Sequence, residues 1–192
     1  MARAARTAPS ARAGVASVLV FYGTTEGHSA KVAAAIGATV RGEGLKIDVL
    51  DAEASQPDAE GYDAAIVVAS VHKGDYQAAV RDWTRRHARA LNAMPSTFVS
   101  VSLGVLQHDP KVEQDNESIR ARFLEKTGWK PAAIEPVAGA LMYSRYNVIE
   151  RMLMKRIAAQ AGGDTDTSRD HEYTDWEDLA AFTRRFAAKI GV

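Results

Sequence analysis

Short, almost wholly apolar segments alternate with segments that repeat an apolar residue every four positions, and this alternation constrains the fold most. Residues 15–22 (VASVLVFY) and 62–70 (YDAAIVVAS) have the composition of strands buried on both faces of a sheet. Between them, Val32, Ile36 and Val40 mark one face of a helix. Strand and helix alternate about five times along the chain. This predicts a doubly wound α/β fold, a parallel sheet with helices on both faces.

The remaining elements continue the pattern. Further strands are expected at 45–50, at 96–103 and within 133–142. Helical stripes are expected at Val80, Trp83, His87 and Leu91, at Ile119, Phe123 and Leu124, and at Leu179, Phe182, Phe186 and Ile190. Thr174 and Glu177 have the Thr-x-x-Glu spacing of a capping box, which predicts the start of the last helix.

Composition bounds the function. A chain of 192 residues fits one domain, and its 24 basic and 24 acidic residues disfavour a nucleic-acid binder. The absence of cysteine excludes disulfides and thiolate-held metals, so redox chemistry requires a bound cofactor. Residues 1–14 are rich in Ala and Arg, and we expect a disordered extension there rather than a transit peptide. No apolar run approaches the ~18 residues that span a bilayer. We expect a cytoplasmic protein, soluble or peripheral on the inner face of the membrane.

Ligands of doubly wound folds bind at the carboxyl ends of the strands, where the first loop is GTTEGHS (23–29). It joins a strand to a helix, and backbone N–H groups at a helix N-terminus favour an anion such as phosphate. The loop has no Lys or Arg and matches neither the Walker A nor the Gly-x-Gly-x-x-Gly pattern. Hydroxyls of Thr24, Thr25 and Ser29 would hold a phosphate monoester, provided that Glu26 points away from it. The alternative is an ordinary βα turn with a Ser N-cap.

The second loop, ASVHKGDYQ, begins at Ala69. Gly74 would let the backbone approach a flat ligand, and Tyr76 could stack on it. The alternative is a loop whose tyrosine faces solvent. His28, His72 and His87 do not have a metal-ligand spacing, and no Ser–His–Asp order is evident, so we expect no metal and assign no catalytic residue.

Beyond these patterns, the motifs TTEGHS, ASVHKGDY and SVSLG together resemble those of flavodoxin-like FMN proteins. AGALMYSRY and GGDTDTSRDHEYTDWEDLAAF further resemble the flavodoxin-like, quinone-dependent protoporphyrinogen oxidases of bacterial haem synthesis. The resemblance runs from about Val15 to the end of the chain. It implies a five-stranded sheet of order 2-1-3-4-5 in one FMN-binding domain, residues 15–192. It also implies an extra segment around 104–128 and an extra amphipathic helix around 146–161.

The resemblance further implies which residues contact FMN. They lie in the strand-end loops and in the late Gly-Gly-x-Thr-Asp-Thr motif: Thr24, Thr25, Glu26, Gly27, His28, Ser29, Ser70, Val71, His72, Lys73, Gly74, Tyr76, Phe98, Ser100, Ser102, Leu103, Gly104, Thr165, Asp166 and Thr167. A porphyrinogen, broad and apolar with two propionates, suits aromatic walls and forked arginines. Tyr143, Arg145, Tyr146 and Arg151 offer that set.

The implied reaction removes six electrons from protoporphyrinogen IX and passes them through FMN to a membrane quinone. Ile149, Leu153 and Ile157 would form the apolar face of a helix lying on an anionic bilayer, or of one that covers the sheet. Ser144, where proline is common, and a mixed-sign segment after residue 104 leave an altered electron donor open.

Three other functions remain open. The first is an FMN-dependent quinone reductase that uses a nicotinamide. The second is a flavodoxin-type electron carrier, which zero net charge disfavours because carriers dock by strong charge. The third is a flavin-free interaction module.

Overall fold

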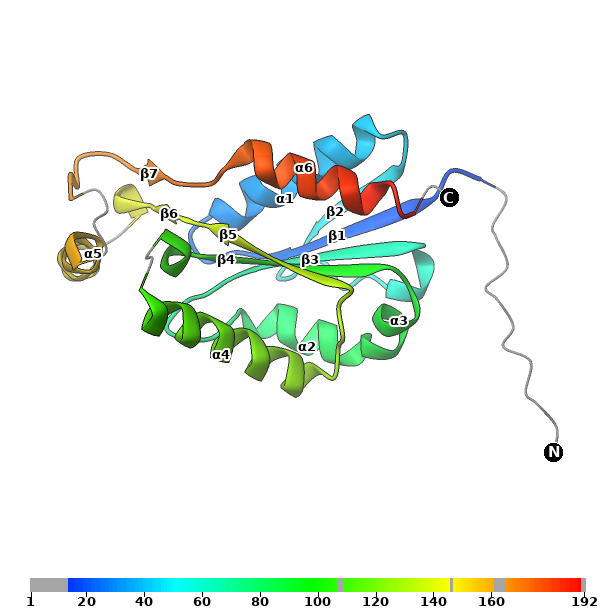
Figure 1. The fold of residues 1–192 in the computed structure, drawn as a ribbon, viewed down its shortest axis with the longest axis horizontal. Coiled ribbons are helices and arrows are strands. Elements are labelled where there is room, and N and C mark those ends of the chain that lie inside the picture. The colour runs from blue at the N-terminus through cyan, green and yellow to red at the C-terminus, as the bar shows by residue number, and fades with distance from the viewer. Residues whose placement is uncertain (1–13, 107–108, 146, 161–164, 191–192) are drawn as a thin grey trace.

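The central sheet of the computed structural model has five parallel strands (Figure 1). The structure describes residues 14–106, 109–145, 147–160 and 165–190. The strands are β1 (Ser17–Gly23), β2 (Lys46–Asp51), β3 (Ala64–Ser70), β4 (Ser96–Ser102) and β5 (Ala133–Ala138). Their order is β2-β1-β3-β4-β5, and every pairing is parallel. The predicted fold class and strand order are therefore confirmed.

Helices cover both faces of this sheet. The helices α1 (His28–Gly42) and α6 (Trp176–Ala187) lie together on one face (Figure 1). The opposite face is covered by α2 (Ala78–Arg86), α3 (Ala88–Ala93) and α4 (Pro110–Thr127). Predicted as one helix, the segment from Val80 to Leu91 divides at His87 into α2 and α3.

Two apolar layers separate the sheet from its helices, because alternate strand residues point to opposite faces. On β1, Val18 and Val20 pack toward α1 and α6, whereas Leu19 and Phe21 pack toward α2–α4. All four side chains are fully buried. At about 1.5–3 kcal/mol for each buried large apolar side chain, these layers dominate the stability of the fold.

The segment between β5 and α6 adds a small second unit to the doubly wound pattern. It contains β6 (Ala140–Leu141), the 3₁₀ turn η3 (Tyr143–Arg145), α5 (Val148–Gln160) and β7 (His171–Glu172). Strands β6 and β7 pair antiparallel. Figure 1 shows this unit at the carboxyl ends of the parallel strands, where ligands of such sheets bind. We call residues 140–172 the insertion.

Both segments that were expected as additions to the fold contain a helix. Most of residues 104–128 form the 3₁₀ turn η2 (Leu103–Leu106) and α4, which is the crossover between β4 and β5. A further 3₁₀ turn, η1 (Ala59–Gly61), precedes β3. The helix expected at 146–161 is α5, but the side chains of Ile149, Leu153 and Ile157 lie outside the described residues, as do residues 1–13 of the expected N-terminal extension. No helix in the described ranges is long and apolar enough to cross a bilayer.

The predicted capping box at the start of α6 is wrong. Asp175 caps the helix instead, because its carboxylate accepts from the backbone N–H groups of Glu177 and Asp178 at 3.1 and 3.0 Å. The hydroxyl of Thr174 is directed elsewhere: it donates to the carbonyl of Ala138 at 2.7 Å and lies 2.7 Å from Nε2 of His28. Leu179, Phe182 and Phe186 of the predicted apolar stripe are buried in α6. Ile190, also predicted for this stripe, lies beyond the end of the helix and is partly buried against the same cluster.

Candidate functional site

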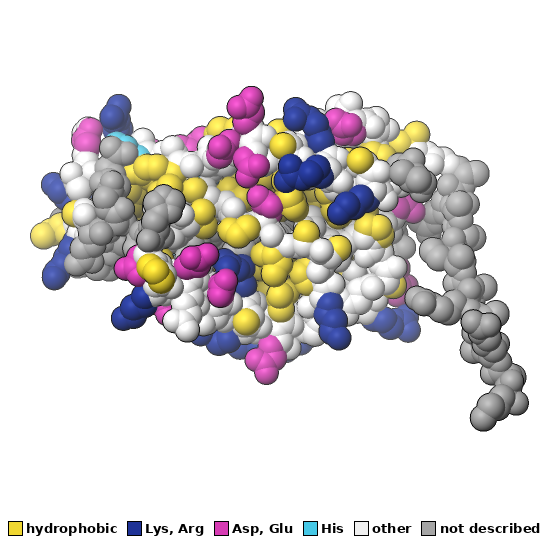
Figure 2. Space-filling model, viewed as in Figure 1, with side chains coloured by type: hydrophobic (Ala, Val, Ile, Leu, Met, Phe, Trp, Pro, Cys, Tyr) yellow, Lys and Arg dark blue, Asp and Glu magenta, His cyan; other side chains and the backbone are white. Residues whose placement is uncertain are grey.

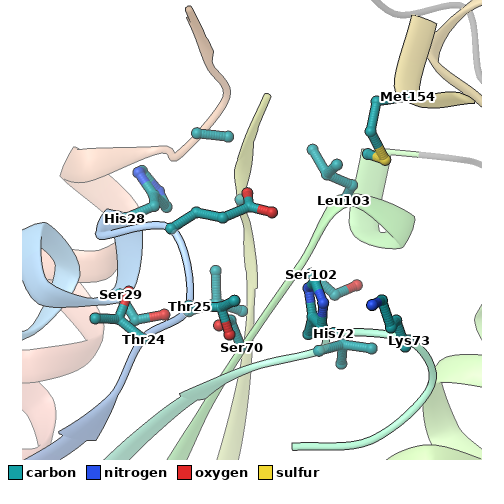
Figure 3. A pocket seen from close by; sticks show the side chains of 15 residues that line it. Thr24, Thr25, His28, Ser29, Ser70, His72, Lys73, Ser102, Leu103 and Met154 are labelled. Carbon is teal, nitrogen blue, oxygen red and sulfur yellow. The ribbon is translucent and has the colours of Figure 1, made fainter. Parts of the chain in front are cut away.

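A cavity of about 360 Å³ lies at the carboxyl ends of the strands, beneath the insertion (Figure 3). Its volume is within the range of small-molecule sites. The loop after β1 forms one side, the ends of β3 and β4 with their loops form the other, and Met154 of α5 lies above Leu103. The lining residues are Thr24, Thr25, Glu26, His28, Ser29, Ser70, Val71, His72, Lys73, Val101, Ser102, Leu103, Gly139, Ala140 and Met154.

The loop after β1 is shaped by Gly27, whose φ of +89° lies in the left-handed region. Its backbone N–H donates to the hydroxyl of Thr24 at 2.8 Å. Helix α1 then begins at His28 without a side-chain cap, so a serine N-cap is excluded here. Ser29 lies inside the first turn, is fully buried, and has a hydroxyl with no hydrogen-bond partner among the described residues. An uncapped first turn with a buried, unpartnered hydroxyl facing a cavity is a site suited to an anion.

A cation reaches this loop from the insertion. A Cβ built on Gly27 would lie 2.9 Å from Nη1 of Arg145, so the guanidinium of η3 lies directly against the loop. Arg145 is exposed to solvent. The loop itself contains no Lys or Arg, so its sequence did not indicate that a positive charge lies beside it. Glu26 also lines the cavity, so its side chain does not point wholly away from the site as simple phosphate binding would require.

The loop after β3 is a two-residue turn. His72 and Asp75 exchange both backbone hydrogen bonds, at 2.9 and 3.2 Å, and the residues between them, Lys73 and Gly74, have φ values of 51° and 79°. Two positive φ angles define a type I′ turn. Arg122 of α4 anchors the turn by donating to the carbonyl of Gly74 at 3.0 Å. This conformation is uncommon for lysine, and it places Lys73 as the one Lys or Arg among the described residues that line the cavity.

Three residues expected at the ligand lie in the core instead. Tyr76 is 4% exposed; its hydroxyl pairs with that of Ser100 at 2.7 Å, and its ring meets Phe98 and Phe123 edge-on. Burial raises the pKa of Tyr76 to about 12. The prediction that Tyr76 stacks on a ligand is therefore wrong. Phe98 and Ser100 lie within β4, whereas Val101 and Ser102, the last two residues of that strand, line the cavity.

Other predicted contacts also lie away from the cavity lining. A Cβ on Gly104 would overlap the side chain of Asn116, so this glycine lets η2 pack closely on α4. Gly74 keeps its carbonyl toward Arg122. Thr165, Asp166 and Thr167 do not line the cavity. The carboxylate of Asp166 accepts from the backbone and hydroxyl of Ser168 instead.

Of the expected substrate residues, only Arg145 is both described and exposed near the cavity. Tyr143 is fully buried within the insertion, with its ring perpendicular to that of His171. Its carbonyl accepts from Nη2 of Arg151 at 3.1 Å, so Arg151 is used to hold η3. Tyr143 therefore does not form a groove wall. Tyr146 lies outside the described residues.

The cavity also contains residues that sequence reasoning missed: Val101, Gly139, Ala140 and Met154. Gly139 follows β5 directly, so its position at a strand end was a usable signal. Met154 had no such signal, because only the folding of the insertion over the strand ends brings α5 to the site.

His28 joins the first loop to the insertion. It is 5% exposed, and its Nε2 lies 2.7 Å from the hydroxyl of Thr174. Its Nδ1 lies 3.6 Å from a carboxylate oxygen of Glu172 on β7. Burial lowers the pKa of His28; the charge of Glu172 acts against this shift, and that of Lys31 adds to it. The neutral ring is therefore favoured at neutral pH.

Comparison with known proteins agrees with this geometry. A family model described as a flavodoxin domain matches residues 19–168. The protoporphyrinogen IX dehydrogenase [quinone] of Escherichia coli K12 is 34% identical over 170 residues, covering 88% of this chain and 93% of that protein. The Leishmania major protein of the same name is 33% identical, covering 88% of this chain and 74% of its own.

Solved structures support the fold alone. A Streptococcus pneumoniae flavodoxin superposes with a TM-score of 0.55 at 16% identity, covering 91% of this chain and 100% of its own. Flavodoxin 2 of Bacillus cereus gives 0.55 at 14% identity, with 91% and 99% coverage. Given the matched family model, the relatives at about one-third identity and the sheet order, the chain belongs to the flavodoxin-domain family.

Proposed function

We propose that this protein is an FMN-dependent dehydrogenase that oxidises protoporphyrinogen IX to protoporphyrin IX in haem synthesis and passes the electrons to a quinone. The carrying observation is the 34% identity to the E. coli enzyme of that name across 88% of this chain and 93% of that protein. This similarity includes the insertion as well as the flavodoxin core.

The residues around the cavity fit FMN. A phosphate monoester would take the buried hydroxyl of Ser29, which otherwise lacks a partner among the described residues, together with backbone N–H groups of the first turn of α1. That turn contains no acidic residue. One such loop suits a mononucleotide, since a dinucleotide would need a second phosphate-binding element.

The chain's own side chains bind and shield the cofactor. FMN, when bound, supplies the electron-transfer chemistry that a chain without cysteine lacks. Lys73, held over the cavity by its strained turn, would favour negative charge on a ligand beside it. Val71, Val101 and Met154 line the cavity with apolar surface that excludes water.

Arg145 is the residue best placed to orient the substrate. It is exposed, and its guanidinium lies against Gly27 in the loop after β1. A guanidinium can bind a carboxylate by two parallel hydrogen bonds. A propionate of the porphyrinogen provides that carboxylate. Arginine stays charged at any working pH, so Arg145 binds and orients the substrate but does not transfer protons.

Peripheral contact with the membrane is part of the proposal, because quinones reside in the bilayer. On α5, Met152 is 71% exposed, and Lys155 and Arg156 are exposed as well. An apolar side chain beside cations suits an anionic lipid surface. Elsewhere, on the face shown in Figure 2, acidic and basic side chains of the described residues are intermixed, unlike the single-sign surface by which a charged carrier docks.

The test begins with the purified protein. We expect denaturation to release FMN, identified by mass. We also expect the fluorescence of protoporphyrin to appear anaerobically only when a quinone is supplied. FAD in place of FMN, or no flavin after reconstitution, would overturn the cofactor assignment. Quinone reduction driven by a nicotinamide, without porphyrinogen oxidation, would establish the reductase instead.

A further inference from the structure

The hydrogen bonds around His28 define its tautomer. The hydroxyl of Thr174 has one proton, and that proton is donated to the carbonyl of Ala138 at 2.7 Å. Toward His28, Thr174 can therefore only accept, so Nε2 carries a hydrogen and donates across 2.7 Å. In the neutral ring this leaves Nδ1 as a bare lone pair.

The other side of the ring presents an electrostatic mismatch. Nδ1 lies 3.6 Å from Oε2 of Glu172, has no hydrogen-bond partner among the described residues, and is buried. A lone pair facing a carboxylate is repelled, whereas an N–H at the same place would be an ion-paired donor. Adding a proton at Nδ1 thus makes the contact between His28 and Glu172 favourable, and neither residue has to change its partner.

The charges facing His28 come from several elements. Glu172 of β7 is held by Lys31 of α1 at 2.9 Å and by the indole N–H of Trp176 of α6 at 3.1 Å. Partial burial acts to raise the pKa of Glu172, but the hydrogen bond and charge of Lys31 outweigh it, aided by His28 and Trp176, so its pKa lies below its usual value. Glu172 is therefore ionised at neutral pH.

Two further charges belong to the site itself. Glu26 lines the same cavity as His28, and Arg145 lies against Gly27, next to His28 in the chain. Burial, Lys31 and Arg145 oppose a positive ring, whereas Glu172 and Glu26 favour it. An anion bound at the loop would add to the charges that favour a positive ring.

We propose that His28 is a positioning residue that takes up a proton on Nδ1 when a phosphate monoester binds to the loop after β1, and that the new N–H donates to Glu172. The proton comes from solvent, and no other bond is formed or broken in the protein. The protonated ring then ties the loop to β7 of the insertion through Glu172 and to the end of β5 through Thr174. This inference rests on the proposed binding of FMN and adds that the phosphate, not the flavin ring, sets the charge of His28.

The test compares FMN with riboflavin, which has the same ring system but no phosphate. Calorimetric titration of the apo-protein near pH 7.5, in two buffers of different ionisation enthalpy, measures protons taken up on binding. At that pH the phosphate is already largely doubly ionised. We expect FMN to be accompanied by uptake of a fraction of one proton, and riboflavin by none.

His28→Gln is the matched variant, because its amide can still donate to Thr174 but cannot titrate. We expect no proton uptake with FMN in this variant. We also expect the ratio of wild-type to variant FMN affinity to rise about threefold or more as the pH falls from about 8 to about 6. Uptake of one full proton would change this ratio by at most about tenfold per pH unit. Taking this ratio cancels the titration of the phosphate itself. The Glu172→Gln variant, which keeps His28, should take up fewer protons on FMN binding than the wild type at the same pH.

The outcomes separate the two proposals. Failure of the apo-protein to bind FMN at all would overturn the proposed function. Normal FMN binding with equal proton uptake in wild type and His28→Gln would overturn only the role of His28. Uptake with riboflavin equal to that with FMN would also overturn it, because the phosphate would then not be the cause. Circular dichroism of the variants checks that each is folded.

Discussion

Replacing Gly27 with alanine separates what this residue does for the fold from what it does for ligand binding. Gly27 has a φ of +89° at the start of α1. Gly44, in the turn after α1, has a φ of +82° and nothing within 4 Å of an added Cβ. A non-glycine residue in the left-handed region costs about 1–2 kcal/mol. Gly44→Ala therefore has the same backbone strain at a position remote from the cavity.

The structure predicts the size of each effect. At Gly27 the new Cβ would meet Nη1 of Arg145 at 2.9 Å, but this is the end of a long exposed side chain that can move. Both variants should therefore lose about 1–2 kcal/mol of apo-protein stability, which corresponds to about 2–8 °C in melting temperature for a domain of this size. Only Gly27 lies in the loop whose backbone N–H groups would hold the phosphate, so only Gly27→Ala should bind FMN about tenfold more weakly or worse, a change of about 1.4 kcal/mol.

The assay measures thermal unfolding of both apo-variants and FMN affinity by fluorescence quenching. If Gly27→Ala binds FMN as tightly as Gly44→Ala does, the glycine serves only the fold. If the apo-protein tolerates Gly27→Ala without loss of stability, the left-handed backbone is not enforced there and the strain argument fails.

Three further substitutions test individual contacts. Ser29→Ala removes a buried hydroxyl that lacks a partner among the described residues, so the stability of the apo-protein should hold or rise. The free energy of FMN binding should weaken by about 0.5–1.5 kcal/mol. A parallel loss of stability and FMN affinity would show that the hydroxyl serves the fold. Tyr76→Phe should cost about 1 kcal/mol of stability, because it breaks the bond to Ser100, and should leave the flavin absorption spectrum unchanged; a shifted spectrum would restore a ligand contact. Arg145→Lys keeps the charge but loses the guanidinium fork, so kcat/KM for protoporphyrinogen should fall about ten- to hundredfold with normal FMN content. A drop in FMN affinity relative to riboflavin would instead assign Arg145 to the phosphate.

The sequence by itself determined the architecture and the edge of the sheet where ligands bind. Apolar runs such as 62–70 are too continuous for strands with one wet face, and helical stripes lie between them, so a parallel sheet covered on both faces was the consistent solution. The strand-end loops followed from that topology. Thr24 and Lys73, expected at this edge, line the cavity there, and the motifs of the last third of the chain indicated the family.

Which side chain of a strand end reaches the cavity was decided only by the tertiary structure. Phe98 and Val101 lie on one strand, yet only Val101 lines the cavity, because Phe98 lies further from the carboxyl end of the strand. Ser102 faces the same layer as Phe98 and still lines the cavity, so position along the strand decides this contact. Tyr76 looks like a stacking residue in its loop, but a space between Phe98 and Phe123 buries it. Local patterns do not show such spaces, which form only when distant elements pack.

Long-range contacts decided the rest of the site. Thr174 has the spacing of a helix cap, yet it bonds to Ala138 and His28, residues distant in the chain, so the capping role falls to Asp175. Arg145 reaches the first loop across more than a hundred residues of chain. Short-range periodicity determines which elements form, whereas the placement of these side chains depends on how the insertion folds back over the carboxyl ends of the sheet.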